Sequence, residues 1–363
     1  MTSEQELLCS VIIPVYNGQA MITRCLDSLA RQTVAAERYE VIVVDDGSSN
    51  GTAEVVERWL DTSSRTQKRL AHWRLLRQPH AGPAAARNGG AAIAKSPLLL
   101  FTDADCTPSA GWVEAMTGPF LGNDPPAGAM GTYLSQQSTP AARFAQYEFE
   151  ERYALMARLS QIDLIATYAA AYNRKLFLQI GGFDTSFPEA NNEDVDFSFR
   201  MSKSGVRMIF VPEATVTHPH VPSWGGYARI KMKRAYWRMQ VYRRYPEKAV
   251  SDGYTPQSLK LQLLLGGAGL LGLLAAGITE SWYWLIPLLL FLAAAAPTAI
   301  FMAARRPSFV LWAVWGIWLR SLAFTVGVVW GLMRPYRFSD PLGDPFPKTS
   351  ESERPAVVPL PNE

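Results

Sequence analysis

The chain has 363 residues, of which 48% are hydrophobic and 18% charged, with a formal net charge of +3 at pH 7. This composition excludes an intrinsically disordered chain, and so small a net charge predicts no nucleic-acid partner. The length suits one large domain with an appendage, or two ordinary domains. Cys9, Cys25 and Cys106 lack the spacing of a disulfide framework or a zinc site, which favours a reducing, cytosol-facing domain.

Short apolar runs alternate with helical stretches in the first third of the chain. Strands are predicted over residues 10–15, 39–45, 73–77 and 98–103, and helices over 20–32, 52–60, 83–94 and 109–120. The strands are nearly continuous in β-branched residues or leucine, as in parallel sheets with helices on both faces. We therefore predict an α/β fold that binds its ligand beyond the carboxyl ends of the strands.

Polar and aromatic residues follow these strands. Tyr16 comes after the first strand, where an aromatic ring can stack on a nucleobase. Asp46 comes after the second, where a carboxylate can accept hydrogen bonds from a base or ribose. The alternative for this second position is a simple turn in which Ser48 caps the next helix.

Two carboxylates, Asp103 and Asp105, leave the fourth strand. Such a pair is costly beside a buried strand unless a positive group lies between them. Mg²⁺ or Mn²⁺ carrying a diphosphate is the obvious candidate, because these cations prefer oxygen ligands. An Asp-x-Asp sequence by itself is also common in solvated loops.

From Leu259 onward the chain becomes apolar. The runs 261–279, 282–304 and 308–333 each match or exceed the roughly 20 residues that cross a bilayer. Three such runs leave too little polar surface for a soluble helical bundle, so we predict two to three transmembrane helices. Met1–Glu6 shows no apolar segment of the kind found in a signal peptide.

Basic residues near these runs predict the orientation. Lys248 and Lys260 precede the first run and Arg305 follows the second, which places the preceding domain in the cytoplasm by the positive-inside rule. The third run contains Arg320 and is followed by Arg334. It can be a tilted span, a re-entrant segment or an interfacial helix, and the sequence leaves these alternatives open.

Two further segments have distinctive compositions. The stretch 227–248 has eight basic residues against Glu247, interleaved with aromatics, which predicts a helix at an anionic membrane surface, with RNA binding as the rival interpretation. Six prolines in 340–363 predict a disordered tail. The predicted divisions are a soluble domain over 1–225, a basic amphipathic segment over 226–258, membrane helices over 259–333 and a Pro-rich tail over 334–363.

The order of seven motifs resembles glycosyltransferase family 2, whose catalytic domain has the A-type nucleotide-sugar-binding fold. The matching segments are 11–17, 44–48, 85–90, 103–105, 181–184, 192–197 with Arg200, and 212–214 with His218. The resemblance covers about residues 9–220. It implies a mostly parallel, helix-covered sheet of the glycosyltransferase A type and a nucleotide diphosphate sugar as donor.

The resemblance also implies roles for single residues. Donor binding falls to Pro14, Tyr16, Asp46, Arg87 and Asp103. Asp105 is implied as a ligand of Mg²⁺ or Mn²⁺, with His218 as a further ligand or else a satisfied strand-end histidine. Asp194 is implied as the catalytic base, with Glu193, Gly182 and Arg200 as candidates on the acceptor side.

These roles imply an inverting, metal-dependent sugar transfer by a multi-pass protein of a bacterial-type inner membrane. Processive synthases of the family carry Gln-x-x-Arg-Trp, and the nearest match here, 240–244, lacks the tryptophan. Transfer of one sugar to a membrane-borne, lipid-linked acceptor in polysaccharide or glycolipid biosynthesis is therefore our first interpretation. The alternatives are a polysaccharide synthase, a polyprenyl-phosphate sugar transferase and an inactive scaffold subunit. A nucleotidyltransferase is disfavoured, because 14–18 is not the Gly-rich, Lys-containing loop it requires.

Overall fold

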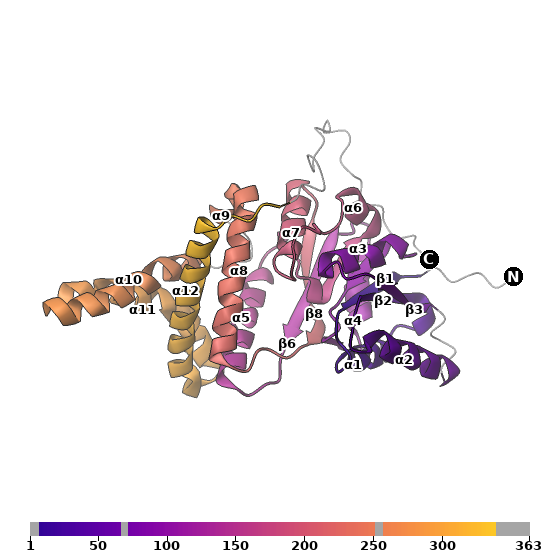
Figure 1. Ribbon diagram of the computed structural model, residues 1–363, viewed down its shortest axis with the longest axis horizontal. Helices are drawn as coiled ribbons and strands as arrows, with labels where there is room; N and C mark the ends of the chain where they lie inside the picture. The colour runs from indigo at the N-terminus through magenta and orange to yellow at the C-terminus, as the bar shows by residue number, and fades with distance from the viewer. Residues whose placement is uncertain (1–6, 67–71, 251–256, 339–363) are drawn as a thin grey trace. The chain divides into compact units, whose positions relative to one another are not determined.

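The structure is a computed structural model that describes residues 7–66, 72–250 and 257–338 (Figure 1). The predicted tail 340–363 lies outside the described residues. The chain divides into two compact units. Within the described residues, the first contains the chain up to Leu134, Leu159–His218 and Phe338, and the second contains Ser135–Arg158 and Pro219–Arg337.

The first unit is built on one eight-stranded sheet of order β3-β2-β1-β4-β7-β6-β8-β5. Its strands are β1 (Cys9–Val15), β2 (Tyr39–Asp46), β3 (Trp73–Gln78), β4 (Leu98–Phe101), β5 (Thr107–Pro108), β6 (Gly128–Leu134), β7 (Ala170–Asn173) and β8 (Met208–Thr217). Strands β3, β2, β1 and β4 are parallel, as is the pair β6–β8, whereas β7 runs antiparallel to β4 and β6. Every residue of β2 is buried. The predicted mostly parallel α/β sheet is confirmed.

Helices accompany this sheet and position its loops. They are α1 (Ile22–Leu29), α2 (Thr52–Thr66), α3 (Pro83–Ile93), α4 (Trp112–Thr117), α6 (Arg174–Gln179) and α7 (Glu193–Lys203). Pro83 begins α3, where its missing N–H is no loss. Gly90 brings α3 onto β1, because a Cβ there would lie 2.5 Å from Ile12 Cγ2. Arg87 lies one turn earlier on the same helix, so this close packing fixes the backbone that carries it.

The second unit is helical. It contains α5 (Pro140–Met156), α8 (Trp224–Arg244), α9 (Pro246–Val250), α10 (Gln257–Thr279), α11 (Ile286–Arg305) and α12 (Val310–Met333). Within the described part of the chain, three segments are long and apolar enough to cross a membrane: Ser258–Thr279, Trp282–Arg305 and Pro307–Met333. They agree with the three predicted apolar runs. Helix α5 belongs to this unit, although it precedes residue 225, the predicted end of the first domain.

Arg320, in the middle of α12, is neutralised inside the second unit. Its Nη1 lies 2.8 Å from Glu148 Oε1 of α5, and Lys231 Nζ of α8 lies 2.8 Å from Glu148 Oε2. Tyr227 donates its hydroxyl to the same carboxylate at 2.8 Å. We call Glu148, Lys231, Arg320 and Tyr227 the Glu148 cluster. It joins three helices far apart in sequence and offsets the charge that made the third apolar run hard to place.

Candidate active site

Asp46 ends β2 with all of its acceptor capacity in use. Its Oδ1 accepts from the Ala81 N–H at 2.9 Å and from Gln78 Nε2 at 2.7 Å. Its Oδ2 accepts from the Gly82 N–H at 2.9 Å and lies 2.8 Å from His80 Nδ1. A carboxylate offers about four lone-pair positions. The donor-binding residue implied by the resemblance therefore organises the loop after β3 in this structure.

His80 is a residue of this region that the sequence analysis did not single out. Its ring stacks on Tyr16, with centroids 4.2 Å apart and an interplanar angle of 25°. Both side chains are about half exposed, at 54% for His80 and 51% for Tyr16 as a residue. Pro14, by contrast, lies within β1. His80 follows the third strand, so the strand-end rule that selected Tyr16 and Asp46 would have found it too.

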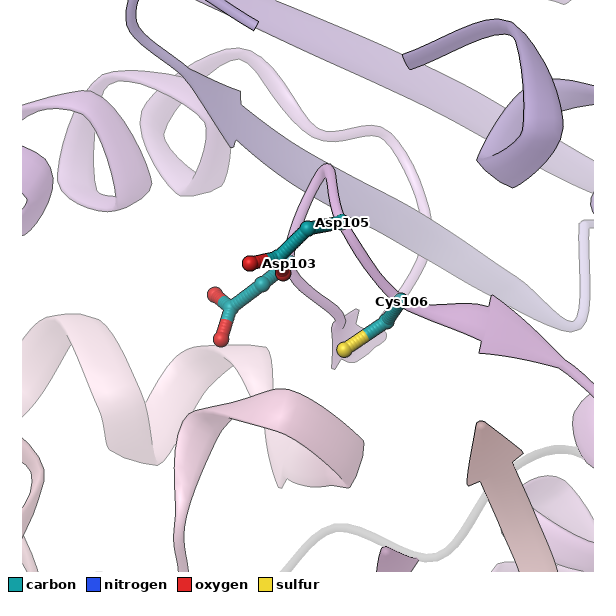
Figure 2. A group of neighbouring side chains, drawn as sticks. All are labelled: Asp103, Asp105 and Cys106. Atoms are coloured by element: carbon teal, nitrogen blue, oxygen red, sulfur yellow. The ribbon is translucent and has the colours of Figure 1, made fainter. Parts of the chain in front are cut away.

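The Asp-x-Asp loop follows β4 and turns sharply back into β5 (Figure 2). Ligand atoms of Asp103, Asp105 and Cys106 lie within 4.8 Å of one another. His218 directly follows β8, and its Nε2 is 2.8 Å from Asp105 Oδ2. The Tyr133 hydroxyl of β6 contacts the other ring nitrogen, Nδ1. The structure thus brings together the two residues implied as metal ligands.

The donor set at this loop fits a divalent cation that prefers oxygen. Asp105 and His218 remain partly exposed, at 37% and 20% of their side chains, so a cation can reach the place where Asp105 Oδ2 pairs with His218 Nε2. Cys106 fits poorly, because burial, reinforced by the charges of Asp103 and Asp105, raises the pKa of its thiol well above the ordinary value. The carboxylates of Asp103 and Asp105 are the oxygen ligands that Mg²⁺ and Mn²⁺ prefer.

Arg87 connects the Asp-x-Asp loop to α7. Its Nη2 lies 2.8 Å from Asp103 Oδ1 and its Nη1 lies 2.8 Å from Glu193 Oε1. The guanidinium and Glu193 are each 4% exposed as side chains, whereas Asp103 is 33% exposed. We call these three residues the Arg87 bridge. In this bridge one planar guanidinium group binds two carboxylates that lie 90 residues apart in the sequence.

Glu193 is an acid whose ionisation is disfavoured. Burial raises its pKa to about 7; Arg87 opposes this shift, and the neighbouring charge of Asp194 adds to it. Its Oε2 is buried and has no hydrogen-bond partner among the described residues. The position next to the implied catalytic base therefore holds a carboxyl group that changes charge near neutral pH.

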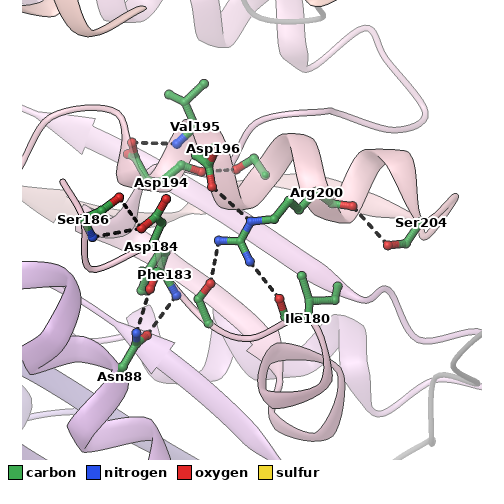
Figure 3. Close-up of polar contacts among 12 residues, drawn as sticks. Asn88, Ile180, Phe183, Asp184, Ser186, Asp194, Val195, Asp196, Arg200 and Ser204 are labelled. Carbon is green, nitrogen blue, oxygen red and sulfur yellow. Dashed lines mark hydrogen bonds and ion pairs between the residues drawn. The ribbon is translucent and has the colours of Figure 1, made fainter. Parts of the chain in front are cut away.

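Asp194 lies in the first turn of α7 and is half-buried. Its Oδ1 accepts from the Val195 N–H at 2.9 Å (Figure 3). Asn192, which precedes the helix, has φ +66°, a left-handed conformation that asparagine tolerates. This sharp entry lets Glu193 reach Arg87 while Asp194 stays partly open.

Arg200 and Gly182, the other acceptor-side candidates, form a support for α7. Arg200 is 1% exposed and pairs with Asp196 Oδ2 at 3.0 Å. It also donates to the carbonyl oxygens of Ile180 at 2.8 Å and Gly182 at 2.6 Å, as Figure 3 shows. Gly182 has φ +66°, and a Cβ there would lie 2.6 Å from Asn88 Oδ1. In this structure both residues fix the loop 180–184 to the helix that carries Asp194.

Comparison with known proteins identifies the family. Residues 10–181 match glycosyl transferase family 2, and residues 122–329 match glycosyl transferase family group 2. The chain belongs to glycosyltransferase family 2. The second match extends through the apolar helices, so they are part of the family pattern.

Two similar curated proteins are glycosyltransferases of bacteria. The validoxylamine A glucosyltransferase of Streptomyces hygroscopicus subsp. limoneus is 30% identical over 243 residues, covering 59% of this chain and 52% of the relative. The pre-mycofactocin glycosyltransferase of Mycobacterium tuberculosis is 31% identical over 219 residues, covering 58% and 42%. This family 2 glycosyltransferase therefore spans about half the length of the curated relatives it matches.

A solved structure shares the fold. The mannosyltransferase from Pyrobaculum calidifontis, in complex with GDP-mannose and Mn²⁺, superposes with a TM-score of 0.55 at 22% identity. The match covers 90% of this chain and 88% of that one. The predicted glycosyltransferase A-type fold is thereby confirmed for this family 2 glycosyltransferase.

Proposed function

We propose that the enzyme transfers a sugar, with inversion, from a nucleotide diphosphate sugar to a membrane-borne acceptor, using Mn²⁺ or Mg²⁺. The observation that carries this proposal is the Arg87 bridge. It joins the Asp-x-Asp loop, where the resemblance puts the donor, to the first turn of α7, which bears Asp194. This connection supports the proposal, because a direct displacement needs the donor and the base held close together.

Residues at the strand ends support the donor side. The ring of Tyr16, on which His80 stacks in this structure, offers an aromatic surface to a nucleobase that displaces His80. A base that hydrogen-bonds Asp46 must replace one of its present donors, and the half-exposed His80 is the side chain most readily displaced. The mannosyltransferase of the same fold is described with GDP-mannose and Mn²⁺, which favours a nucleotide sugar and a cation here.

The reaction follows from the arrangement. Asp194 removes the proton from the acceptor hydroxyl as its oxygen attacks the anomeric carbon, and the bond from that carbon to the diphosphate breaks. A single base and one displacement invert the anomeric configuration. Asp105 and His218 would hold the cation, which when bound supplies positive charge to the leaving diphosphate. Asp103 and Arg87 orient the donor from the adjacent edge of the loop.

The acceptor is proposed to be membrane-borne because the same chain carries three candidate membrane helices. A lipid-linked acceptor can stay in the bilayer while its hydroxyl meets the donor. With Lys248 and Lys260 on the cytoplasmic side, the catalytic unit faces the compartment that supplies nucleotide sugars.

The test uses membranes that contain the protein, with a divalent cation, native lipid acceptors and a panel of labelled uridine, guanosine and thymidine diphosphate sugars. Asp194→Asn removes the base. Asp61→Asn, the same change at an exposed position of α2, is the matched control. We expect label in the organic-extractable fraction with wild type and Asp61→Asn, and a loss of about 10²- to 10⁴-fold with Asp194→Asn.

Other distributions of label would replace the proposal. Label only in aqueous polymer would indicate a processive synthase. Label carried by a polyprenyl monophosphate would indicate a polyprenyl-phosphate sugar transferase. If no donor gave transfer above the Asp194→Asn variant, a scaffold role would take precedence.

A further inference from the structure

Helices α10 and α11 form a closely packed hairpin with an apolar surface. Gly269 lets the helices approach, since a Cβ there would lie 3.3 Å from the Leu288 Cα. Toward the tip the side chains are exposed and apolar, with Ile278 at 83% and Trp282 at 64%. Glu280 lies at the tip itself and is exposed. Interfacial aromatics and a charge at the end of an apolar hairpin indicate that the tip reaches the far membrane surface.

Helix α12 follows a different course. It lies beside α8 along most of its length (Figure 1). Trp312 stacks on Trp224 near the start of both helices, and Arg243 Nη2 donates to the Leu332 carbonyl oxygen at 2.9 Å near their ends. Between these points Gly327 lies directly against the α8 backbone. The two helices therefore run parallel and at the same depth.

The composition of α8 decides what that depth is. Within Trp224–Arg244 there are seven basic residues, which are Arg229, Lys231, Lys233, Arg234, Arg238, Arg243 and Arg244. If α12 crossed the bilayer, the parallel α8 would carry this whole series through the hydrocarbon, where basic side chains are strongly disfavoured. At the membrane surface the six of these residues outside the Glu148 cluster can face lipid headgroups, while Lys231 stays paired with Glu148. The pairing thus places α12 at the interface.

The surface of α12 has the two sides that such a position requires. Toward the protein it buries 39% of its apolar window, against 22% for each of the other two candidate spans. Arg320 points to this buried side, into the Glu148 cluster. On the other side large apolar residues are exposed, among them Leu311 at 81%, Val326 at 54% and Met333 at 76%. The exposed side of α12 can contact lipid tails, and its other side is covered by the charged helices α5 and α8.

The hairpin meets α12 at its base. Gln262 Oε1 lies 2.5 Å from Arg320 Nη2, and Thr325 Oγ1 donates to the Leu263 carbonyl oxygen at 3.1 Å. A Cβ at Gly266 would lie 2.8 Å from Ser321 Cβ. These contacts come from the first turns of α10 only, and Figure 1 shows α12 running across the direction of the hairpin. One buried core contains residues of α11 from Phe291 to Met302 and residues from Phe309 to Ile317 at the start of α12.

We propose that α10 and α11 cross the membrane as a hairpin, whereas α12 lies in the membrane plane, in the leaflet that contacts α8. Both ends of α12 then lie on one side of the membrane. This arrangement puts Arg305 and Arg306 on the same side as Arg334 and Arg337, as the positive-inside rule favours. It also removes Arg320 from the bilayer centre. The proposal is independent of which sugar and acceptor the enzyme uses.

Labelling of single introduced cysteines tests the topology in the full chain. The native Cys9, Cys25 and Cys106 are at most 1% exposed, so their background reaction is low. Ser281→Cys marks the hairpin tip, Ser308→Cys the start of α12 and Arg337→Cys the segment after it. In sealed right-side-out and inverted vesicles, a membrane-impermeant maleimide is expected to label Ser308→Cys and Arg337→Cys from one side and Ser281→Cys from the other.

Two results would overturn the proposal. Labelling of Arg337→Cys from the same side as Ser281→Cys would show that α12 crosses. Labelling of all three cysteine variants from one side would show that the hairpin does not cross the membrane.

A depth measurement separates an in-plane α12 from a tilted one. Spin labels on Leu311→Cys and Val326→Cys, both exposed positions, are 15 residues apart. A perpendicular span would separate their depths by about 22 Å, at 1.5 Å per residue. We expect nearly equal depths from collision with lipid-soluble and water-soluble relaxants. A depth difference of more than about half that separation would contradict the in-plane position.

Discussion

The two units each bury a cluster of three charges, with the signs reversed. In the Arg87 bridge one cation is shared by two carboxylates, and in the Glu148 cluster one carboxylate is shared by two cations. The Glu148 cluster is closed, since its three charged side chains are 1–4% exposed. The Arg87 bridge is open at one end, because Asp103 is 33% exposed.

The difference separates a structural cluster from a candidate catalytic one. Burial alone would raise the pKa of Glu148, but Lys231, Arg320 and Arg152 outweigh it and hold that pKa far below its ordinary value. In Glu193 burial outweighs Arg87, and the pKa rises. A closed cluster with excess cations keeps its carboxylate ionised, whereas an open cluster with excess carboxylates leaves one of them able to change charge near neutral pH.

The largest expected effect comes from breaking the closed cluster. Glu148→Gln leaves Lys231 and Arg320 buried without their counter-ion, and we expect a loss of about 3–5 kcal/mol in unfolding free energy. Glu150→Gln is the control, since Glu150 pairs with Arg305 at a more exposed position and should cost at most about 1 kcal/mol. Unfolding in detergent measures both. Equal losses would show that the closed cluster has no special structural role.

The next effect concerns the pH dependence of stability. Glu193 has a raised pKa of about 7 in the folded chain against an ordinary value of 4.5. The protonated Glu193 therefore contributes fully to the free energy of unfolding below about pH 4.5. This contribution is lost as the pH rises through 7, and the loss is on the order of 3 kcal/mol. Glu193→Gln should flatten the decline in unfolding free energy between pH 5 and 8. The surface change Glu57→Gln should keep it. If the unfolding free energy of Glu193→Gln declined with pH as steeply as that of wild type, Glu193 would not be the group responsible.

The open bridge is tested by a change that keeps its charge. Arg87→Lys retains one cation but cannot hold Asp103 and Glu193 with a planar fork. Loss of one charged hydrogen bond, about 1.5–3 kcal/mol, predicts a fall in kcat/KM of roughly 10- to 100-fold. Arg77→Lys, which changes an exposed pair with Glu54, should leave kcat/KM unchanged. Wild-type activity in Arg87→Lys would show that joining the two carboxylates is not required.

The smallest effect is expected at the donor edge. If a nucleobase displaces His80 from Tyr16, His80→Ala should lower the donor KM. The stacked pair is worth about 0.5–1.5 kcal/mol, which corresponds to roughly a 2- to 10-fold change. His72→Ala, an exposed histidine outside the stack, is the control. A rise in KM would mean that His80 contacts the donor instead of yielding to it.

Much of the fold was predictable because it depends on local pattern. Strand β2 was predicted over 39–45 and is observed over Tyr39–Asp46, and α3 differs by one residue from its predicted 83–94. The predicted strand 98–103 ends earlier, at Phe101, because the chain turns there to expose Asp103. The antiparallel β7 was not predicted, since a strand of four residues is too short to show a periodicity of its own.

The residues proposed for the site follow from local signals in the sequence, whereas the connections between them do not. Strand ends and motif order indicated Asp103, Asp105 and Asp194. The Arg87–Glu193 pair spans 106 positions and the Arg320–Glu148 pair spans 172, and no local pattern reports contacts of that range. Arg320 was recognised as costly in a membrane, but a partner in α5 could be found only in three dimensions.

The Arg87 bridge has a thermodynamic consequence for how the enzyme binds its two substrates. If Asp103 faces the donor and Glu193 the acceptor, as the family resemblance implies, one guanidinium is a common partner of both. A donor that binds to Asp103 changes the electrostatic field at Glu193. An acceptor that binds to Glu193 changes the field at Asp103 in return. Linkage makes the two influences equal in size: whatever factor the first substrate applies to the affinity of the second, the second applies to the first.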